Sequence, residues 1–442
     1  MLSNNLKTSK PQNLKTSISM SREVEALDIA NEAGHILLEN GAEISRVEEV
    51  MDRISSHYGV DAKHFFVLSN GIFTTGQGYA NVEHIPIHGC QLDRVVEVNQ
   101  LSRDIEKHNL TLEQASRRLE KIRQMPNHPA WEQILASALG SGAFCAIFGG
   151  SLLDCAISTL CGIILWIYVL WVSAPYLSKV IGNITGGMLV SLMCIISHHL
   201  IPSAHLGNMV IGAIIPLIPG ISFTNGIRDL AAEDYLAGMT RLADALMVFF
   251  CMAIGVCTIF IIDSYIFGSM IQLHGMLTDP LTANWLIQIE VAYLGTVSFA
   301  VLFGVPRRFY HGAGICGTLG WIVYLVFTRL LGTSGIEAMF FATMIVVLSS
   351  YQCASTLHCP VIIFIVCGIF PLVPGAGVFW TSYYIVSDQL QAALNSGFMA
   401  CKGTVAIVFG IIIMTEFSRR FKLFNVWNSF VKLLIKPLNP RY

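Results

Sequence analysis

Charge is scarce in most of this 442-residue chain. Charged residues make up 13 % of the sequence and hydrophobic residues 54 %, which is too apolar for an ordinary soluble domain. The stretch 133–418 contains only eleven acidic and seven basic residues. Because water alone cannot solvate a surface so poor in charge, this stretch is predicted to lie in a lipid bilayer. The net charge of −2 gives no support for nucleic-acid binding.

Several other signals are absent. The first twenty residues contain no apolar run of the kind found in a secretory signal, and 1–21 is predicted to be a disordered tail. The twelve cysteines include no Cys-x-x-Cys pair, so no disulfide framework, metal site or cofactor is predicted. Neither a His-Glu-x-x-His motif nor a serine nucleophile with a matched histidine is found. We therefore assign no catalytic residue and do not expect an enzyme.

Most of the charge lies at the beginning of the chain. Residues 1–132 contain 14 of the 27 Lys and Arg and 18 of the 29 acidic residues. The hydrophobic pattern there predicts helices and strands, in the order helix 22–59 with a break at Gly41, strands in 63–75 and 82–88 with a turn at 69–71, and helices 93–108 and 111–123. Thr111 and Gln114 form an N-capping signal for the last helix. These elements predict a small cytoplasmic α/β domain over 22–125.

Ten apolar runs follow, each long enough to span about 30 Å of hydrocarbon. They form two groups of five, at 132–262 and 285–415, with an external loop predicted at 263–284 and a basic cytoplasmic tail at 416–442. The loops on one predicted side contain no Lys or Arg, whereas the loops on the other side contain Lys179, Arg228, Arg241, Arg307 and Arg308. Both termini are therefore predicted to be cytoplasmic, and Arg329 is the exception near an outer end.

A proline–glycine motif occurs once in each group. Pro216-Leu-Ile-Pro-Gly220 ends the fourth run and Pro371-Leu-Val-Pro-Gly375 ends the ninth, 155 positions later. Proline removes a backbone donor and leaves carbonyls free, which is tolerated only where they face protein or water. Since five is an odd number, the second group enters the membrane upside down. The predicted fold is an α-helical polytopic membrane protein with two inverted five-helix repeats, as in secondary transporters. Simple kinks in packed helices are the alternative.

Several segments resemble the threonine/serine exporter family. Residues 40–59, FVLSNGIFTT at 66–75 and PGISFTNGIRD within 219–242 are similar to its larger N-terminal part. GVPRRFYHGAGICG within 303–324 and the segment 369–378 are similar to its smaller partner protein, so the two parts are fused here. The resemblance covers roughly 22–418.

The resemblance implies a ten-span exporter in the plasma membrane. Its substrates would be L-threonine and L-serine, with C4-dicarboxylates such as succinate as the alternative, and efflux would be driven by proton antiport. The implied partners are lipid, protons and the small polar substrate, and homo-oligomerisation is left open. A membrane-anchored hydrolase or sensor is a weaker alternative, because ten spans exceed what an anchor needs. A passive channel is not distinguished by sequence.

Candidate substrate ligands lie near the two breaks. Arg228 and Asp229 could hold the carboxylate and ammonium groups of a zwitterion, and Thr224 and Asn225 a hydroxyl group. Alternatively, Arg228 only marks the membrane interface and Asp229 balances it. The second break has no Arg–Asp pair. The predicted substrate-binding set is Pro219, Gly220, Thr224, Asn225, Arg228, Asp229, Pro374, Gly375, Thr381 and Lys402.

Charged residues within spans are also candidates, because each costs ~2.5–3.5 kcal/mol to insert at the centre of a span. Lys402 is predicted to bind the substrate carboxylate, while Glu290 or Asp244 carries the exchanged proton. Asp154, at the start of the second run, is a further proton-coupling candidate. An ion pair between Glu290 and Lys402 that only supports packing is the alternative.

Gly312-AGIC-Gly317 fits the pattern G-x-G-x-x-G of dinucleotide sites. No strand precedes it, and Gly314, Gly317 and Gly320 follow at three-residue spacing. This spacing predicts a helix face for close packing rather than a nucleotide site. His198, His199 and His205 cluster near an outer loop and are interpreted as interface histidines, with pH sensing as the alternative.

Overall fold

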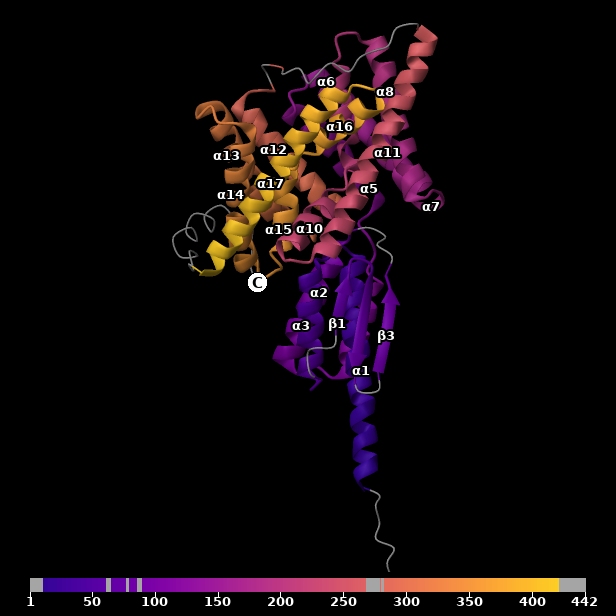
Figure 1. The fold of residues 1–442 in the computed structure, drawn as a ribbon, viewed down its shortest axis with the longest axis vertical. Helices are drawn as coiled ribbons and strands as arrows, with labels where there is room; N and C mark the ends of the chain where they lie inside the picture. The colour runs from indigo at the N-terminus through magenta and orange to yellow at the C-terminus, as the bar shows by residue number, and fades with distance from the viewer. Residues whose placement is uncertain are drawn as a thin grey trace, which may run out of the picture. The chain divides into compact units, whose positions relative to one another are not determined.

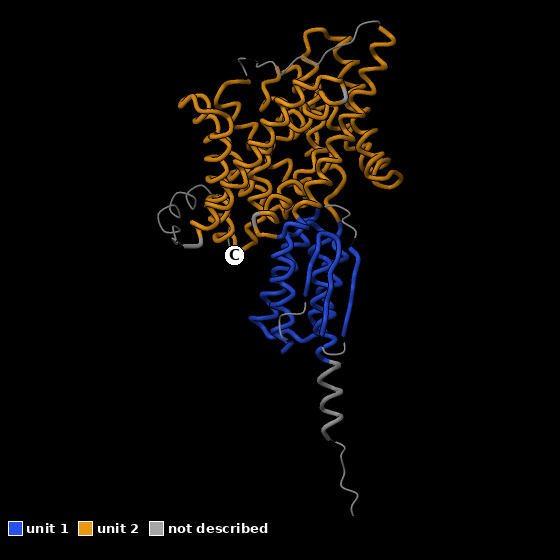
Figure 2. Tube along the Cα trace, in the orientation of Figure 1, with its two compact units in different colours: residues 1–126, 234–237 blue, residues 127–233, 238–442 orange. Residues whose placement is uncertain are grey.

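The computed structural model describes residues 11–60, 65–76, 79–85, 90–267, 279 and 282–420. The chain divides into two compact units, 1–126 with 234–237 and 127–233 with 238–442 (Figure 2). The predicted tails at 1–21 and 416–442 and the loop at 263–284 lie in part outside the described residues. Of these three segments, 11–21, 263–267 and 416–420 belong to helices, whereas 279 and 282–284 lie outside helices.

Unit 1 combines four helices with a three-stranded antiparallel sheet (Figure 1). The elements are α1 (Pro11–Glu39), α2 (Ile44–His57), β1 (Phe65–Leu68), β2 (Gly71–Gly76), β3 (Tyr79–His84), α3 (Leu92–His108) and α4 (Leu112–Arg123). The sheet order is β1-β2-β3, with Phe66 opposite Phe73 and Phe73 opposite Val82. The predicted order of helices and strands in this region is confirmed.

The predicted helix stripes form the core of unit 1. Leu27, Ile36 and Leu37 of α1 are almost fully buried, as is the apolar stripe of α2. Gly41 adopts a φ of +84°, which glycine reaches without strain, and it separates α1 from α2 where the break was predicted. Thr111 and Gln114 form the expected capping box at the start of α4.

A polar network joins α1 to the sheet. The Tyr79 hydroxyl donates to Asp28 at 2.7 Å and accepts from the Asn31 amide at 3.0 Å. The Thr74 hydroxyl donates to Asn31 Oδ1 at 2.5 Å. Burial and the neighbouring Asp28 carboxylate raise the pKa of Tyr79 to about 12. The phenol therefore remains protonated, and able to donate its hydrogen bond, throughout the physiological pH range.

Unit 2 is entirely helical where it is described (Figure 1). Its first part contains α5 (Ala130–Ile147), α6 (Leu152–Tyr168), the π-helical turn η1 (Val169–Ser173), α7 (Ala174–Tyr176), α8 (Lys179–Leu200), α9 (Leu206–Ile214), the 3₁₀ turn η2 (Ile215–Leu217), α10 (Gly220–Ala231) and α11 (Tyr235–Phe267). Its second part contains α12 (Trp285–Leu302), η3 (Arg307–Phe309), α13 (Tyr310–Leu325), the π-helical turn η4 (Val326–Leu330), α14 (Gly335–Leu357), α15 (Ile362–Ile369), the 3₁₀ turn η5 (Phe370–Leu372), α16 (Gly375–Val386) and α17 (Leu390–Arg420).

Among the described residues, seven helices are long and apolar enough to cross a membrane. The number is nine if each of two bent helix pairs counts as one span. The first predicted span, 132–150, forms α5 but is not among these helices. It carries Glu132 and Gln133 near its start and Ser137 and Ser141 further along, which lower its mean hydropathy. The ten predicted spans thus correspond to seven to nine candidates by length and composition.

The two parts of unit 2 repeat the same series of elements. Matching helices begin at 130 and 285, 179 and 335, 206 and 362, 220 and 375, and 235 and 390, separations of 155 or 156 residues. Both parts have a π-helical turn after the second long helix and a 3₁₀ turn before the Pro-Gly pair. The repeat therefore extends well beyond the two proline motifs visible in the sequence.

The matching helices α5 and α12 pack against each other in opposite directions. Gln288, near the start of α12, donates to the Ala146 carbonyl near the end of α5 at 3.0 Å. Arg307, just after α12, pairs with Glu132 at the start of α5. The contact is also reciprocal. A Cβ on Gly140 would lie 3.6 Å from the Phe299 ring, and a Cβ on Gly295 would lie 3.0 Å from Phe144.

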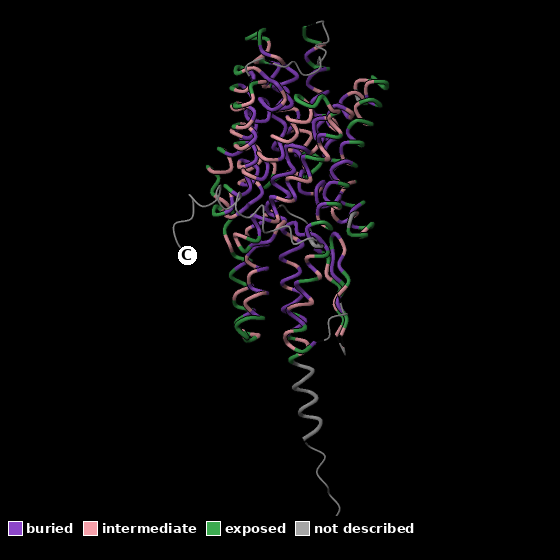
Figure 3. The backbone as a smooth tube through the Cα atoms, turned by 90° about the vertical axis from the view of Figure 1, so that its left-hand side faces the viewer, coloured by how far each residue is buried: buried purple, intermediate pink, exposed green. Residues whose placement is uncertain are grey.

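Aromatic rings fill the centre of this crossing. Phe144 and Phe299, 155 positions apart, meet edge to face at 5.3 Å between centroids. Phe370 of η5 stacks on Phe299 at 3.7 Å and meets Phe144 at 5.5 Å. Figure 3 shows the buried segments concentrated in the interior of the helical unit. The second helix break is thereby anchored to the contact between α5 and α12.

Glycines bring other helices of unit 2 into backbone contact. A Cβ on Gly314 or Gly317 of α13 would lie 2.5 Å from Tyr293 or 2.3 Å from Thr296 of α12, which confirms the predicted close-packing face. On α11, a Cβ at Gly255 would lie 2.0 Å from the Ile184 carbonyl of α8. At the matching position of α17, a Cβ at Gly410 would lie 3.0 Å from the Phe340 carbonyl of α14.

Replacing Gly255 with alanine should therefore destabilise the protein more than the same change at Gly410. Overpacking against a backbone carbonyl costs about 1–3 kcal/mol, whereas alanine gains about 1 kcal/mol of helix propensity over glycine. We expect Gly255→Ala to lower the unfolding temperature of the purified chain in detergent, and Gly410→Ala to change it little. An unchanged unfolding temperature for Gly255→Ala would contradict the close contact of α8 and α11.

Candidate functional site

The first break bends a helix and does not end it. After α9, the 3₁₀ turn η2 contains Pro216, Pro219 precedes the new helix, and α10 begins at Gly220. The two helical segments meet at a bend of 67°. The motif was predicted to end the fourth run, and in the structure a second helix follows it directly. Although proline interrupts the backbone hydrogen bonds, a proline ahead of the first helical residue is compatible with a new helix, so the chain resumes at once.

The second break has the same construction. Pro371 lies in η5, Pro374 precedes α16, and α16 begins at Gly375, with a bend of 51° between the two segments. Here too a second helix directly follows the motif, which was predicted to end the ninth run. Two bent helix pairs of equal design thus occur in one unit.

The two breaks pack against each other. A Cβ on Gly220 would lie 2.2 Å from the Phe370 ring, and a Cβ on Gly375 would lie 3.1 Å from Ile218. Each glycine is thus covered by a residue of the other break. Both predicted pairs, Pro219–Gly220 and Pro374–Gly375, are brought to one place, although the sequence separates them by half the length of the membrane part.

The polar residues after the first break lie on α10 and are largely buried. Thr224, Asn225 and Asp229 are each 1 % exposed, and Arg228 is half-buried. Asp229 forms an ion pair with Arg241 of α11, with 2.9 Å between Oδ2 and Nη1, and Arg241 is 5 % exposed. The sequence prediction missed this partner because Arg241 was assigned to a loop. Its position within an apolar helix and one turn beyond Gly238 was the available signal.

The matching helix α16 is aromatic where α10 is polar. Positions 155 residues after Thr224, Asn225, Arg228 and Asp229 are Phe379, Trp380, Tyr383 and Tyr384. These rings contact one another at 5.5 to 6.5 Å between centroids. The predicted ligand Thr381 donates its hydroxyl to the Gly377 carbonyl one turn earlier, at 2.7 Å. The two halves are therefore unequal, because α10 carries polar residues at the positions where α16 carries aromatic ones.

The predicted charges of the long helices are not brought together. Lys402 of α17 and Glu290 of α12 are both exposed, and no ion pair joins them or links either to another described residue. Lys402 borders a shallow groove with Phe398 and Val405 of its own helix. Asp244 of α11 pairs with Lys179 at the start of α8, at 2.5 Å, and both side chains are about half exposed.

Asp154 is fully buried at the start of α6. It forms a capping box with Ser151, accepts the His205 backbone N–H at 2.7 Å, and lies 2.9 Å from His205 Nδ1. His205 caps the start of α9, the first arm of the first bent pair. A second histidine, His199, pairs with the buried Asp263 at 2.9 Å. The prediction singled out Asp154 but did not identify its histidine partner.

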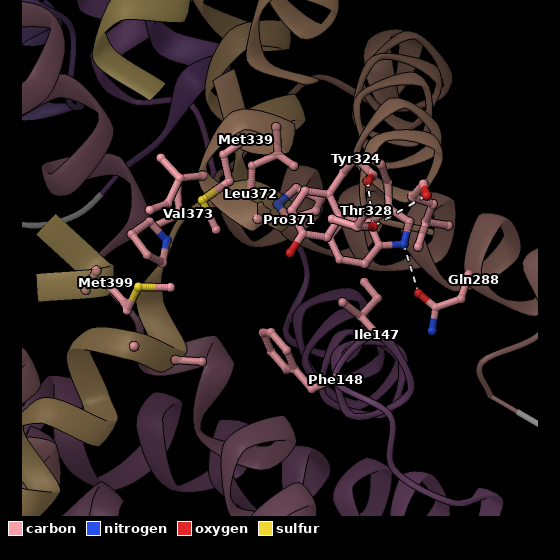
Figure 4. A pocket seen from close by; sticks show the side chains of 18 of the residues that line it. Ile147, Phe148, Gln288, Tyr324, Thr328, Met339, Pro371, Leu372, Val373 and Met399 are labelled. Atoms are coloured by element: carbon pink, nitrogen blue, oxygen red, sulfur yellow. Dashed lines mark hydrogen bonds between the residues drawn. The ribbon is translucent and has the colours of Figure 1, made fainter. Parts of the chain in front are cut away.

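A cavity of about 370 Å³ lies beside the second break (Figure 4). Ile147 and Phe148 border it from the end of α5, Tyr324 and Thr328 from α13 and η4, and Met399 from α17. Its lining continues with Gln288, Trp321, Arg329, Gly335, Met339 and the break residues 371–374. Of the predicted binding residues, only Pro374 borders this cavity.

Gln288 and Trp321 meet at one end of the cavity. The Trp321 indole donates to Gln288 Oε1 at 2.9 Å, and both side chains are buried. The same bond occurs in the first half, where Trp166 donates to Gln133 at 3.2 Å. In the sequence, each glutamine precedes its tryptophan by 33 residues. No local pattern links a glutamine to a tryptophan so far along the chain, so the bond was not predicted.

Comparison with known families agrees with this architecture. Residues 28–262 match the family model described as "Putative threonine/serine exporter", and residues 288–417 match a second model described as "Threonine/Serine exporter, ThrE". The chain belongs to the threonine/serine exporter family. Each of the two family models describes one part, and this single membrane protein contains both parts.

Similar proteins span most of the chain. A "Threonine/serine exporter" of Corynebacterium glutamicum is 21 % identical over 92 % of this chain and 86 % of its own length. A "Probable threonine/serine exporter" of Mycobacterium tuberculosis is 20 % identical over 88 % of this chain and 75 % of its own. A "Probable succinate transporter subunit" of Escherichia coli is 23 % identical over 51 % of this chain and 90 % of its own. No solved structure matches the chain.

The buried ion pair generates a stability prediction. Removing one partner of a buried pair leaves an unpaired charge and costs about 3–5 kcal/mol, so Arg241→Gln should strongly lower the unfolding temperature. Adding Asp229→Asn should recover part of the loss. The half-exposed pair of Lys179 and Asp244 is the matched control, because exposed pairs are worth about 0–1 kcal/mol. Thermal unfolding in one detergent compares these two variants with Lys179→Gln alone and with Lys179→Gln combined with Asp244→Asn, and equal losses at both pairs would contradict the prediction.

Proposed function

We propose that the chain is a secondary active exporter of L-threonine and L-serine in the plasma membrane, driven by proton antiport. In this proposal ten membrane segments form two inverted five-helix repeats, with α5 counted as the first. Both termini lie in the cytoplasm, and unit 1 is a cytoplasmic domain. Alternating access comes from the two repeats exchanging roles around the bent helices.

The contact between the two breaks carries this proposal. Gly220 lies against Phe370 and Gly375 against Ile218, so two interrupted helices meet near the centre of a helical bundle. Interrupted helices leave backbone groups free for a polar solute, which is how inverted-repeat transporters build their sites. The antiparallel pairing of α5 with α12 supports the inversion, and membership of the exporter family supports the direction of transport.

A C4-dicarboxylate exporter is the second candidate. The similarity to a protein named as a succinate transporter subunit favours it, although that likeness covers only 51 % of this chain. The fused arrangement of both family parts favours the amino acids, as do two relatives that match 92 % and 88 % of this chain and carry the name of threonine/serine exporters.

Transport by vesicles containing the purified chain tests the proposal. Labelled serine and threonine should accumulate against their gradients only when a pH gradient is imposed, and succinate should not. Empty vesicles give the background. A channel would be indicated if the labelled amino acids moved only down their own gradients, equally with and without the pH gradient. Accumulation of succinate alone would favour the second candidate.

The proton is proposed to act at Asp154 and His205. Of the three predicted proton-coupling residues, Asp154 is the buried one, whereas Glu290 is exposed and Asp244 is held by Lys179. The Asp154–His205 pair connects α6 to the start of the first bent helix pair. A proton taken up or released there changes the attraction between these two elements.

Asp154→Asn should therefore uncouple transport from the pH gradient. We expect serine accumulation driven by the gradient to fall at least about tenfold, while exchange of internal for external serine, which needs no net proton movement, is retained. Asp244→Asn and Glu290→Gln are the comparisons, and vesicle uptake under both conditions is the measurement. Loss of coupling in Glu290→Gln alone would move the role to Glu290.

A further inference from the structure

Arg329 is a charged residue of unit 2 to which the proposed function assigns no role. Under the predicted orientation it is the exception to the distribution of basic residues, lying near an outer end. It lies in the π-helical turn η4, and π-helical turns occur frequently at functional sites. The matching position in the first half is Ala174, which carries no charge. A basic residue at this one position therefore calls for a specific explanation.

Arg329, an exposed residue, is part of the lining of the cavity beside the second break. It donates to the Ala283 carbonyl and, within the described part of the chain, forms no ion pair with a carboxylate. The other side chains around the cavity include no Lys, Asp or Glu. Among the described residues that line the cavity, Arg329 is thus the one charged residue, and no carboxylate accompanies it.

Two stacked aromatic rings border the same cavity and can attract a positively charged group. Trp321 and Tyr324 lie 4.8 Å apart between centroids, with 15° between their planes, and both border the cavity. The hydrogen bond to Gln288 fixes the orientation of the Trp321 ring. Aromatic faces attract an ammonium group without carrying charge, by about 0.5–2 kcal/mol.

We propose that this cavity is the substrate pocket, with Arg329 binding the substrate carboxylate and the Trp321–Tyr324 rings facing its ammonium group. The assignment rests on the proposed transport function and names its ligands. A volume of about 370 Å³ is at the low end of the ~300–1,000 Å³ typical of small-molecule sites. The pocket fits a small zwitterion with one carboxylate, because a second carboxylate would lie against apolar side chains without a cation.

Equilibrium binding to the full-length purified chain tests the pocket without any gradient. Labelled L-serine is the probe, and unlabelled serinamide, which lacks the carboxylate, and succinate are the competitors. Wild-type protein should bind serine saturably, and both competitors should be at least about tenfold weaker. Absence of saturable serine binding, or equal competition by serinamide or succinate, would overturn the assignment.

Variants locate the binding group. Arg329→Gln should weaken serine binding about 10- to 100-fold, because a charge-assisted hydrogen bond is lost, and it should remove the preference for serine over serinamide. Arg329→Lys should restore part of the affinity. Arg308→Gln, at an arginine outside the cavity lining, is the matched control and should bind as wild type. Circular dichroism and size-exclusion profiles identify variants that fail to fold, in which case the competitor series on wild type decides.

Lys402→Gln tests the rival cation in the same assay. Lys402 lies outside the cavity, so serine affinity should be unchanged if Arg329 is the ligand. Loss of affinity in Lys402→Gln with full affinity in Arg329→Gln would overturn the assignment. Binding that depends on Arg329, combined with no transport in vesicles, would instead retain the pocket and reject the proposed export.

Discussion

The antiparallel contact between α5 and α12 is the constraint on which the rest of unit 2 depends. Gly140 and Gly295 let the two helices approach, and Phe144 and Phe299 fill the space that each glycine leaves on the partner. Such a contact is self-complementary, as in an isologous interface between identical subunits. Every element that packs on α5 therefore has a counterpart packing on α12 in the opposite direction, including the two bent helix pairs and their meeting point at Phe370.

The two halves differ most in the polar, charged and aromatic residues near the helix breaks. The buried pair of Asp229 and Arg241 lies on the polar helix α10, and its counterpart α16 has Phe379, Trp380, Tyr383 and Tyr384. Conversely, Arg329 has the uncharged Ala174 as its counterpart in the first half, and it lines a cavity that residues of both halves border. The two halves thus share one scaffold and differ in the residues next to the two helix breaks.

The sequence predicted most of what depends on local patterns. Hydrophobic periodicity gave the helices and strands of unit 1, and Gly41 gave the break between α1 and α2, because such features depend on neighbouring residues. Proline motifs located the two interruptions but not the fact that the helices resume after them. The Gln288–Trp321 bond, the partner of Asp229 and the cavity were not predictable, because they arise from contacts between helices distant in sequence. The assignments of Lys402 and Glu290 followed insertion cost alone, which does not tell a lipid-facing side chain from one inside the bundle.

Arg329 has no carboxylate partner in the part of the chain that the structure describes, and this has an electrical consequence for the proposed pocket. A pocket with a single fixed guanidinium has a charge of +1 when empty, and it keeps that charge when a net-neutral amino acid binds. The membrane potential, worth about 2.3 kcal/mol per elementary charge and 100 mV, therefore acts on the charge of this pocket equally with and without the amino acid. A dianionic solute would instead reverse the sign of the occupied pocket.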